Sequence, residues 1–205
     1  MPATRIMVQK WPFTLAFLGT MIAANVLVGM GFGPLPGEVL ERFGLSLSSV
    51  MAGEVWRLLT AVFLSHDGGM FLRQLAFAAL VLGAAEAVMG TRRAAITFFA
   101  IDLLGSVLLL FMFIAPVSGL PDPAYAAIAT RHDVGMSAGG FGLLGALIAD
   151  WKWQWAGFVA LTAALLAKLV FWPDPIADSA HLLTLAMGFG WQLMRPRHAL
   201  KKVDE

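Results

Sequence analysis

The chain contains no cysteine, and only 13% of its 205 residues are charged. The absence of thiols excludes disulfides, thiolate metal sites, iron–sulfur clusters and cysteine nucleophiles. Soluble domains average about 25% charged residues, so the scarcity of charge argues against a water-soluble globule. The net charge of +1 provides no basic surface for nucleic acid. Hydrophobic residues make up 59% of the chain and the mean hydropathy is +0.78, which predicts an all-α, polytopic membrane protein.

Six apolar segments approach the roughly 20 residues that a helix needs to cross the hydrocarbon. They run approximately over residues 13–30, 70–89, 94–115, 137–149, 155–172 and 179–194. The fourth is short and rich in glycine, and the sixth follows Pro173 and Pro175. Spans of this kind usually lie inside a bundle, where protein rather than lipid satisfies irregular backbone. We therefore predict a six-helix membrane domain over residues 13–195.

Positive residues gather on one side of these segments. They are Arg5, Lys10, Arg92, Arg93, Lys152, Arg195, Arg197, Lys201 and Lys202. The opposite connections hold mostly Asp and Glu, so the positive-inside rule predicts a cytoplasmic segment 1–12 and a cytoplasmic tail 196–205. We expect no cleavable signal peptide, because the apolar segment after Lys10 is long and lacks a small-residue cleavage site. An integral protein of a bacterial inner membrane is the expected setting.

Polar or ionisable side chains inside an apolar span need a reason to be there. The chain has six of note, which are Gln74, Glu86, Asp102, Ser137, Lys168 and His181. We interpret Glu86 as a tie between helices or loops, and Lys168 as a side chain that reaches the interface. Asp102 has neither a second membrane Asp nor a Gly-x-Gly-Asp context, which argues against an aspartyl protease.

Ser137 and His181 are expected to lie at the same depth, on two segments that run from outside to inside. Ser137 is thirteen residues from Asp150 at the inner boundary, or about 20 Å of helix, and His181 is fourteen from Arg195, or about 21 Å. A serine hydroxyl becomes an effective nucleophile when an adjacent base, usually neutral imidazole, accepts its proton. Equal depth is what a Ser–His pair requires. The structural alternative is that the serine mediates helix packing and the histidine completes a hydrogen-bond network.

The segment 135–146, GMSAGGFGLLGA, resembles the GxSGxxxGLLGA stretch of the rhomboid intramembrane serine proteases. Other landmarks of that family occur in the same order: Trp56-Arg57 in the first outer connection, Phe63-Leu64 before the second span, Gly83, Glu86, Gly90 and Arg92-Arg93 towards its end, Gly105-Ser106 in the third, and Ala180-His181 with Gly188 in the sixth. The resemblance covers about residues 13–195. It implies structural roles for Trp56, Arg57, Glu86, Gly135, Gly142 and Gly188, and small residues such as Gly142 allow close helix packing.

The resemblance implies that Ser137 attacks a scissile carbonyl in or near a transmembrane helix, with His181 as general base and then acid. The implied oxyanion donors are the backbone N–H groups of Met136 and Ser137, together with Gln74. The chain departs from the family pattern at three positions. Met70 and Gln74 occupy the places of a His and an Asn in span two, and Ala138 replaces the glycine after the serine. Met70 cannot donate a hydrogen bond, whereas the Gln74 amide can.

Two functions therefore follow from the sequence. The first is an intramembrane serine protease that cleaves transmembrane segments of membrane proteins. The alternative is a rhomboid-like pseudoprotease that grips a partner's transmembrane helix or serves as an accessory subunit of a larger membrane complex. A small transporter is disfavoured, because no inverted halves are evident. We expect the lipid bilayer and a substrate or partner helix as partners, no nucleic acid, no cofactor and no catalytic metal, since no HExxH or comparable ligand set occurs.

Overall fold

The computed structural model describes residues 11–195. The predicted tail 196–205 lies outside the described residues, as do residues 1–10 of the predicted N-terminal segment. Five of the positive residues used to predict the orientation also lie outside them: Arg5, Lys10, Arg197, Lys201 and Lys202. The described residues contain all six predicted apolar segments.

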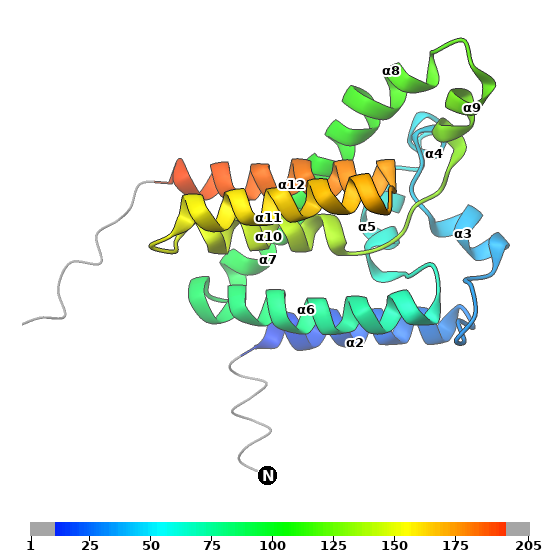
Figure 1. Ribbon diagram of the computed structural model, residues 1–205. Helices are drawn as coiled ribbons and strands as arrows, with labels where there is room; N and C mark the ends of the chain where they lie inside the picture. Colours follow the sequence, from blue (N-terminus) through cyan, green and yellow to red (C-terminus); the bar gives the residue numbers. More distant parts are fainter. Residues whose placement is uncertain (1–10, 196–205) are drawn as a thin grey trace, which may run out of the picture.

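Six long helices correspond to the six predicted segments (Figure 1). They are α2 (Pro12–Leu27), α6 (Gly68–Met89), α7 (Thr91–Leu108), α10 (Ser137–Ala149), α11 (Gln154–Phe171) and α12 (Pro175–Leu193). The last begins four residues before its predicted start at residue 179. Its N-terminus is set by Pro175 in the first helical turn and by Asp174, whose side chain accepts a hydrogen bond from the backbone N–H of Ala177.

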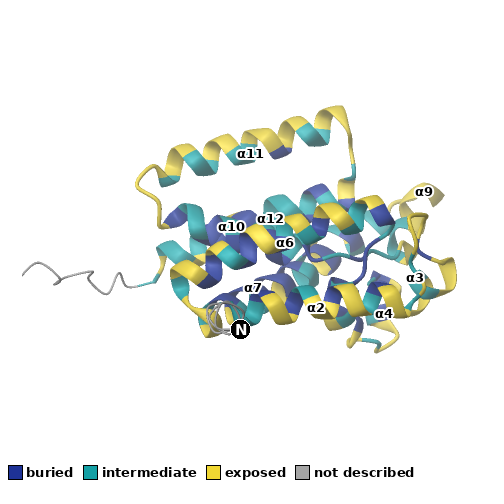
Figure 2. Ribbon diagram, turned by 90° about the horizontal axis from the view of Figure 1, so that it is seen from below, coloured by how far each residue is buried: buried dark blue, intermediate teal, exposed yellow. Residues whose placement is uncertain are grey.

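α10 lies at the centre of the bundle. It packs against α12, α7 and α6, while α2 packs along α6 and α11 along α12. In Figure 1, α10, α11 and α12 form one group, α2 and α6 form a second, and α7 contacts both. Burial agrees with this packing: α10 is largely buried, whereas α11 is exposed along most of its length (Figure 2). The residues that carry a candidate site on α10 are thus held by three neighbouring helices.

Close contact between α10 and α12 depends on glycine. A Cβ on Gly188 would overlap the carbonyl oxygen of Gly142, and one on Gly145 would overlap the carbonyl oxygen of Leu185. The two backbones can approach this closely only because neither position carries a side chain. Gly142 and Gly188, both noted as motif residues in the sequence, therefore meet at the junction of the two helices that carry Ser137 and His181.

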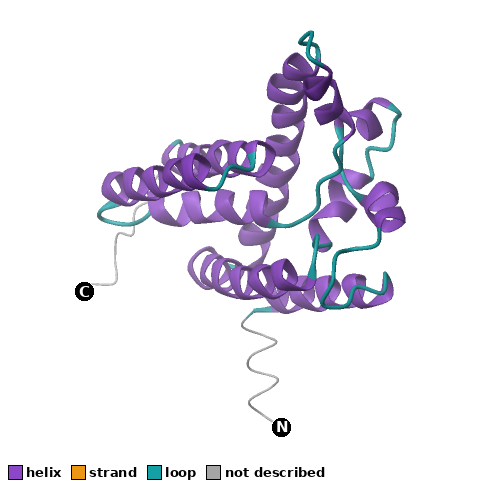
Figure 3. Ribbon diagram, turned by 45° about the vertical axis from the view of Figure 1, so that its right-hand side comes forward, coloured by secondary structure: helices purple, strands orange, loops and turns teal. Residues whose placement is uncertain are grey.

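The connections hold short helices, and residues 11–195 contain no strand (Figure 3). The first long connection contains α3 (Gly37–Phe43), α4 (Leu47–Met51), α5 (Arg57–Thr60) and the 3₁₀ helix η1 (Ala61–Phe63), and the second contains α9 (Pro123–Ala126) and the 3₁₀ helix η3 (Ala127–Thr130). An isolated antiparallel bridge joins the two connections, because the N–H groups of Leu45 and Asp133 each donate to the other's carbonyl oxygen at 2.8 Å. The bridge holds the first connection against the segment that leads into α10.

The third long helix continues beyond α7. A π-helical segment, η2 (Leu109–Ile114), leads into α8 (Ala115–Ser118), so that the helix is continuous over Thr91–Ser118. Within it the N–H of Ala115 donates to the carbonyl oxygen of Leu110, five residues earlier. Pro116 follows directly, and since proline lacks an N–H and its ring crowds the carbonyl four residues back, a wider turn accommodates it. The helix ends at Ser118, three residues beyond residue 115, where the predicted segment ends.

Three helical stretches among the described residues are long and apolar enough to cross a membrane. They are Gly68–Met89, Thr91–Ser118 and Gln154–Phe171, while α2 and α10 are shorter apolar helices. α10, with 13 residues, is about 20 Å long and shorter than the roughly 30 Å hydrocarbon core. The chain is thus an all-helical membrane protein, and the count of six spans stays a prediction.

Candidate active site

Ser137 is the first residue of α10, and the two residues before it are held in unusual backbone conformations. Gly135 has φ +133°, which is suited to glycine, and its N–H donates to the carbonyl oxygen of Ala61 at 3.0 Å. Met136 is fully buried at the N-cap position with φ −88° and ψ 0°, in the sparsely allowed bridge region. This turn presents the Ser137 hydroxyl at the end of a buried helix.

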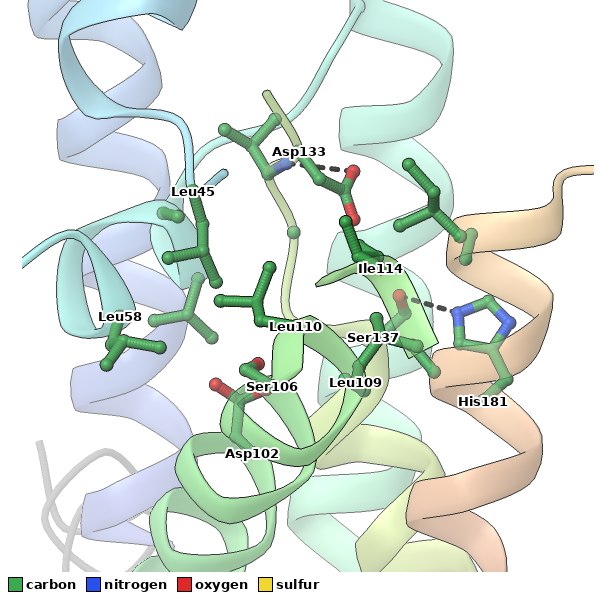
Figure 4. Close-up of a pocket in the computed structure, with 18 of the residues that line it drawn as sticks. Leu45, Leu58, Asp102, Ser106, Leu109, Leu110, Ile114, Asp133, Ser137 and His181 are labelled. Atoms are coloured by element: carbon green, nitrogen blue, oxygen red, sulfur yellow. Dashed lines mark hydrogen bonds between the residues drawn. The ribbon is translucent and has the colours of Figure 1, made fainter. Parts of the chain in front are cut away.

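The Ser137 hydroxyl oxygen lies 2.8 Å from Nε2 of His181 on α12. Figure 4 shows the two side chains pointing toward each other across the gap between their helices. The ring of Phe141, one turn along α10 from Ser137, lies against the imidazole with centroids 4.4 Å apart and an interplanar angle of 32°. The structure thus brings together the two residues that the sequence places at equal depth, and an aromatic ring holds the imidazole from one face.

A third element, α7, fixes the first turn of α10. Asp102 is 5% exposed, and its Oδ1 accepts a 2.9 Å hydrogen bond from the N–H of Gly139. The first intrahelical bond of α10 runs from the N–H of Gly140 to the carbonyl oxygen of Met136. The N–H groups of Met136 and Ser137 precede that bond, and helix geometry leaves such N-terminal groups without intrahelical acceptors. Asp102 therefore occupies one N-terminal donor of α10 and not those nearest the serine.

A cavity opens beside the serine. Its walls include Asp102 and Ser106 from α7, Leu110 from η2, and Ser137 and His181 (Figure 4). About 60 Å³ of it is accessible to the centres of water molecules. Because one water needs about 10–15 Å³ by that measure, the cavity holds several. The cavity therefore has room for water beside the Ser–His pair.

Gln74 lies beside this turn, on α6. It is 5% exposed, and its Oε1 accepts a 2.6 Å hydrogen bond from the hydroxyl of Ser65, which is fully buried. A Cβ placed on Gly135 would overlap Nε2 of Gln74, so the amide nitrogen lies directly against Gly135. That nitrogen is buried and has no hydrogen-bond partner. Met70 lies next to it, with its methyl group 3.1 Å from the same Cβ position.

The unpaired amide nitrogen is a notable feature of the site. A buried donor without an acceptor costs about 1–3 kcal/mol. Here the donor is held in place by the bond on the other side of the amide, which comes from Ser65. Its position beside Gly135, two residues from Ser137, places an unpaired donor close to the serine.

Arg57 holds the first connection together. The guanidinium is buried, and it donates to the carbonyl oxygens of Glu41 and Gly44 at the end of α3, the second at 2.9 Å. It also pairs with the carboxylate of Glu54 at 2.7 Å. The neighbouring Trp56 is partly exposed, and its ring lies 5.4 Å from the Arg57 guanidinium carbon. Both residues of the Trp-Arg pair are therefore part of the scaffold and do not reach the Ser–His pair.

Two loop histidines lie near the site. Nε2 of His66 lies 3.0 Å from Oδ1 of Asp133, a cavity-lining residue, and this hydrogen bond raises the pKa of His66 above its ordinary value of 6.5. Partial burial lowers the pKa of His132. Gln74, and neither of the two histidines, is the polar side chain that lies against Gly135. Both histidines are residues of the connections between the long helices.

Glu86 caps a helix to which it does not belong. Its carboxylate accepts hydrogen bonds from the N–H groups of Phe13 and Thr14, the Thr14 hydroxyl and the Thr91 hydroxyl, at 2.6–3.0 Å. It thereby supplies acceptors to the start of α2, which has no side-chain cap of its own. Glu86 ties α2, α6 and α7 together, as its sequence position suggested, and lies at the end of α6 away from Ser137.

Two contacts close to the site are not predicted from the sequence. Lys168, which the sequence predicts at the membrane interface, has a partly exposed side chain, and its Nζ pairs at 2.6 Å with Asp178, which is fully buried one turn before His181. The second contact is the bond from Ser65 to Gln74. The available signal was weak in both cases, because a loop serine and a charge near a helix end are common features. Among residues 11–195 no group of three or more His, Cys, Asp or Glu side chains is placed to hold a metal ion.

The fold and site together define a class of membrane protein: a helical bundle in which a partly buried hydroxyl–imidazole pair faces a cavity with room for water. The model of the Rhomboid domain family matches residues 52–197, well over half of the chain. The chain therefore belongs to the rhomboid family. A comparison with curated proteins finds no match.

Proposed function

We propose that this chain is an intramembrane serine protease that cleaves transmembrane segments of membrane proteins. The observation that carries the proposal is the 2.8 Å separation of the Ser137 hydroxyl from Nε2 of His181, beside a water-accessible cavity. A nucleophile and a base within hydrogen-bond distance are the basic requirement for covalent acyl transfer. The roles of the other residues follow from where they lie relative to Ser137 and His181.

In the acylation step, the Ser137 oxygen attacks the scissile carbonyl carbon while its proton moves to Nε2 of His181. The carbonyl π electrons pass to the oxygen and form a tetrahedral oxyanion. When the intermediate collapses, the C–N bond breaks and His181 gives its proton to the leaving amine. The products of this step are a free N-terminus on one fragment and an ester between Ser137 and the other.

The oxyanion needs hydrogen-bond donors aimed at the position where its charge develops. We assign this role to the N–H groups of Met136 and Ser137 and to Nε2 of Gln74. The unpaired state of that nitrogen, its burial and its place against Gly135 support the assignment. Gln74 thereby takes the part that Asn takes in the family pattern, although its side chain is one methylene longer.

Deacylation requires water at the ester. A water molecule in the cavity beside Ser137 attacks the acyl carbon, His181 accepts its proton, and the C–O bond to Ser137 then breaks. His181 returns the proton to the serine oxygen, which restores the resting pair. Asp102 and Ser106, on the opposite wall, provide polar groups that keep this cavity hydrated.

We propose further that all six long helices span the membrane with both termini in the cytoplasm. α6, α7 with its extension, and α11 are long and apolar enough alone, and α10 is short enough to place Ser137 below the outer surface. A reporter inserted near Pro121 should then be extracytoplasmic, and one fused after Glu205 cytoplasmic. An extracytoplasmic C-terminus would overturn the topology.

One observation favours the alternative, a rhomboid-like pseudoprotease that binds a partner's transmembrane helix or serves as an accessory subunit. The Met70 methyl group lies against Gly135, where the family pattern has a histidine. A thioether donates no hydrogen bond, so one auxiliary group of the family site is missing. Co-purification of a stoichiometric membrane partner with a protein that never reacts as an enzyme would favour this function.

Activity-based labelling distinguishes the two functions. A fluorophosphonate reacts with a serine only when a base activates it, so wild-type protein in detergent should label and Ser137→Ala should not. His181→Ala should reduce labelling at least 10²-fold, since it removes the base. If the folded wild-type protein does not label, the protease proposal fails.

A further inference from the structure

A basic pocket lies at the opposite end of the bundle from Ser137. It is formed where α6 turns into α7 and where α12 ends, and in Figure 1 the C-terminal ends of α6 and α12 lie on the same side of the molecule. About 400 Å³ of it is accessible to the centres of water molecules. Three of its lining residues are Arg92, Arg93 and Arg195, while Met89 and Ile96 supply an apolar wall. The proposed proteolysis uses none of these residues.

Each of the three guanidinium groups has donors to spare. Arg93 uses one nitrogen in a 2.7 Å bond to Oε1 of Gln192, but its Nε is buried and has no partner. Arg195 lies over the ring of Trp191, with its guanidinium carbon 5.6 Å from the ring centroid. This stacking leaves its N–H groups free to point outward in the plane of the guanidinium. Arg92 is exposed.

The start of α7 adds to the positive field. Gly90 is the N-cap residue, so the helix has no side-chain cap. In the first intrahelical bond of α7, the N–H of Ala94 donates to the carbonyl oxygen of Gly90. Thr91 and Arg92, which both line the pocket, come before it, so their N–H groups have no intrahelical acceptors. An 18-residue helix carries a partial positive charge at this end.

The acidic groups nearby are already engaged. Glu86, one turn before Gly90, accepts its four hydrogen bonds from α2 and from the Thr91 hydroxyl. Asp150 accepts a 2.6 Å bond from the Gln192 amide, the same side chain that receives Arg93. Within residues 11–195, neither carboxylate forms an ion pair with any of the three arginines. The pocket is therefore a concave site with an excess of positive charge.

We propose that this pocket binds a phosphate group, carried by the headgroup of an anionic phospholipid or present as free phosphate. Arginine forks and helix N-termini are the groups that proteins use for phosphate. The apolar wall formed by Met89 and Ile96 and the stacked Trp191 suit a headgroup whose acyl chains continue along the helices. Occupancy would link α6, α7 and α12 at the end of the bundle remote from the Ser–His pair.

Native mass spectrometry of the delipidated full chain in detergent tests the proposal. The probes are phosphatidylglycerol, phosphatidylcholine and inorganic phosphate, each titrated at fixed ionic strength. Phosphatidylglycerol should bind saturably and more tightly than phosphatidylcholine, whose headgroup carries no net charge. Each arginine near a phosphate contributes about a fivefold change in affinity, so Arg92→Gln combined with Arg195→Gln should weaken phosphatidylglycerol binding about 25-fold. Arg93 is left in place because it supports Gln192.

The matched control is Arg42→Gln combined with Lys152→Gln. It removes the same number of positive charges, and like Arg195 both residues lie over aromatic rings, at 5.5 and 5.8 Å, but neither lines the pocket. The control should bind phosphatidylglycerol within about threefold of wild type. If millimolar phosphate competes with phosphatidylglycerol for the wild-type protein but not for the pocket variant, free phosphate is an occupant of the same site. Equal loss in both double variants, or no saturable binding of either ligand, would overturn the proposal.

Discussion

The hydroxyl of Ser65 donates a 2.6 Å hydrogen bond to Oε1 of Gln74, and this bond sets the direction of the whole amide. With the oxygen held by Ser65, the nitrogen lies against Gly135 with no partner of its own. A glutamine free to rotate would satisfy that nitrogen elsewhere or turn its oxygen toward the site. In the proposed mechanism, the Ser65–Gln74 pair thus prepares a donor for the oxyanion.

Substitutions of these two residues should separate the donor from its support. Gln74→Ala should lower kcat about 10²-fold with little change in KM, because it removes one oxyanion donor. Ser65→Ala keeps the donor but releases it, and should lower kcat about tenfold, the loss expected for one hydrogen bond. Gln74→Asn, which restores the family residue, should keep or raise activity. Cleavage rates per folded molecule measure these effects; an unchanged rate in Gln74→Ala with a lowered Tm would mean that Gln74 only joins helices.

Gly188 and Gly190 offer a matched pair on α12. Gly188→Ala places a methyl group on the carbonyl oxygen of Gly142, so the two helices must separate, and the cost should be about 1–3 kcal/mol or more. Gly190→Ala meets nothing within 4 Å, and alanine favours helix over glycine. Thermal unfolding in detergent should therefore show a lowered Tm for the first variant and an unchanged or raised Tm for the second. Equal Tm values would contradict the close contact.

Asp102 should matter as an acceptor and not as a charge. Asp102→Ala removes the group that caps Gly139 and should lower the free energy of unfolding by about 1 kcal/mol, as other helix caps do. Asp102→Asn retains an oxygen and is less costly to bury, so its stability should match or exceed wild type. Chemical denaturation of the three proteins in one detergent provides the comparison. If Asn is as damaging as Ala, the carboxylate has a different role.

The His66–Asp133 pair should make stability depend on pH. The hydrogen bond to Asp133 raises the pKa of His66 in the folded protein above 6.5, so the folded state holds the proton more tightly than the unfolded state. The stabilisation is complete below the unfolded pKa and is lost as the pH rises through the folded one. Both side chains are partly exposed, so the effect is small.

The check compares wild type with His66→Gln by thermal unfolding at several pH values. Wild type should have the higher Tm at pH about 5.5, and its advantage should shrink toward pH about 8.5. A difference in Tm that is constant across this range would show that the imidazole contributes through packing alone.

The placement of the Ser–His pair could be predicted because it depends on regular helix geometry. Counting 1.5 Å per residue from each inner boundary puts Ser137 and His181 at one depth, and the glycines at 142 and 188 indicate which helices can approach closely enough. The six long helices follow equally from their apolar length. Helix length, depth along a helix and the positions of small residues are each properties of a single segment of the sequence.

The remaining contacts depend on how each helix is rotated about its own axis. Whether Asp102 faces α10 or lipid, and whether Lys168 meets Asp178, is decided by packing across several helices. Membrane helices carry little amphipathic signal to indicate that rotation, because lipid and protein interior are both apolar. The π-helical segment before Pro116 and the bond from the loop residue Ser65 likewise depend on local backbone and contacts between segments, which no apolar pattern indicates.

The proposed function is that Ser137 and His181 together cut a transmembrane substrate. Its most direct test is cleavage of a transmembrane reporter by the full chain in proteoliposomes, compared with Ser137→Ala and His181→Ala at equal folded protein. Wild type should form a product that is absent with Ser137→Ala and reduced at least 10²-fold with His181→Ala. Equal cleavage by wild type and Ser137→Ala, or no cleavage of any of a panel of transmembrane reporters by folded wild type, would contradict it.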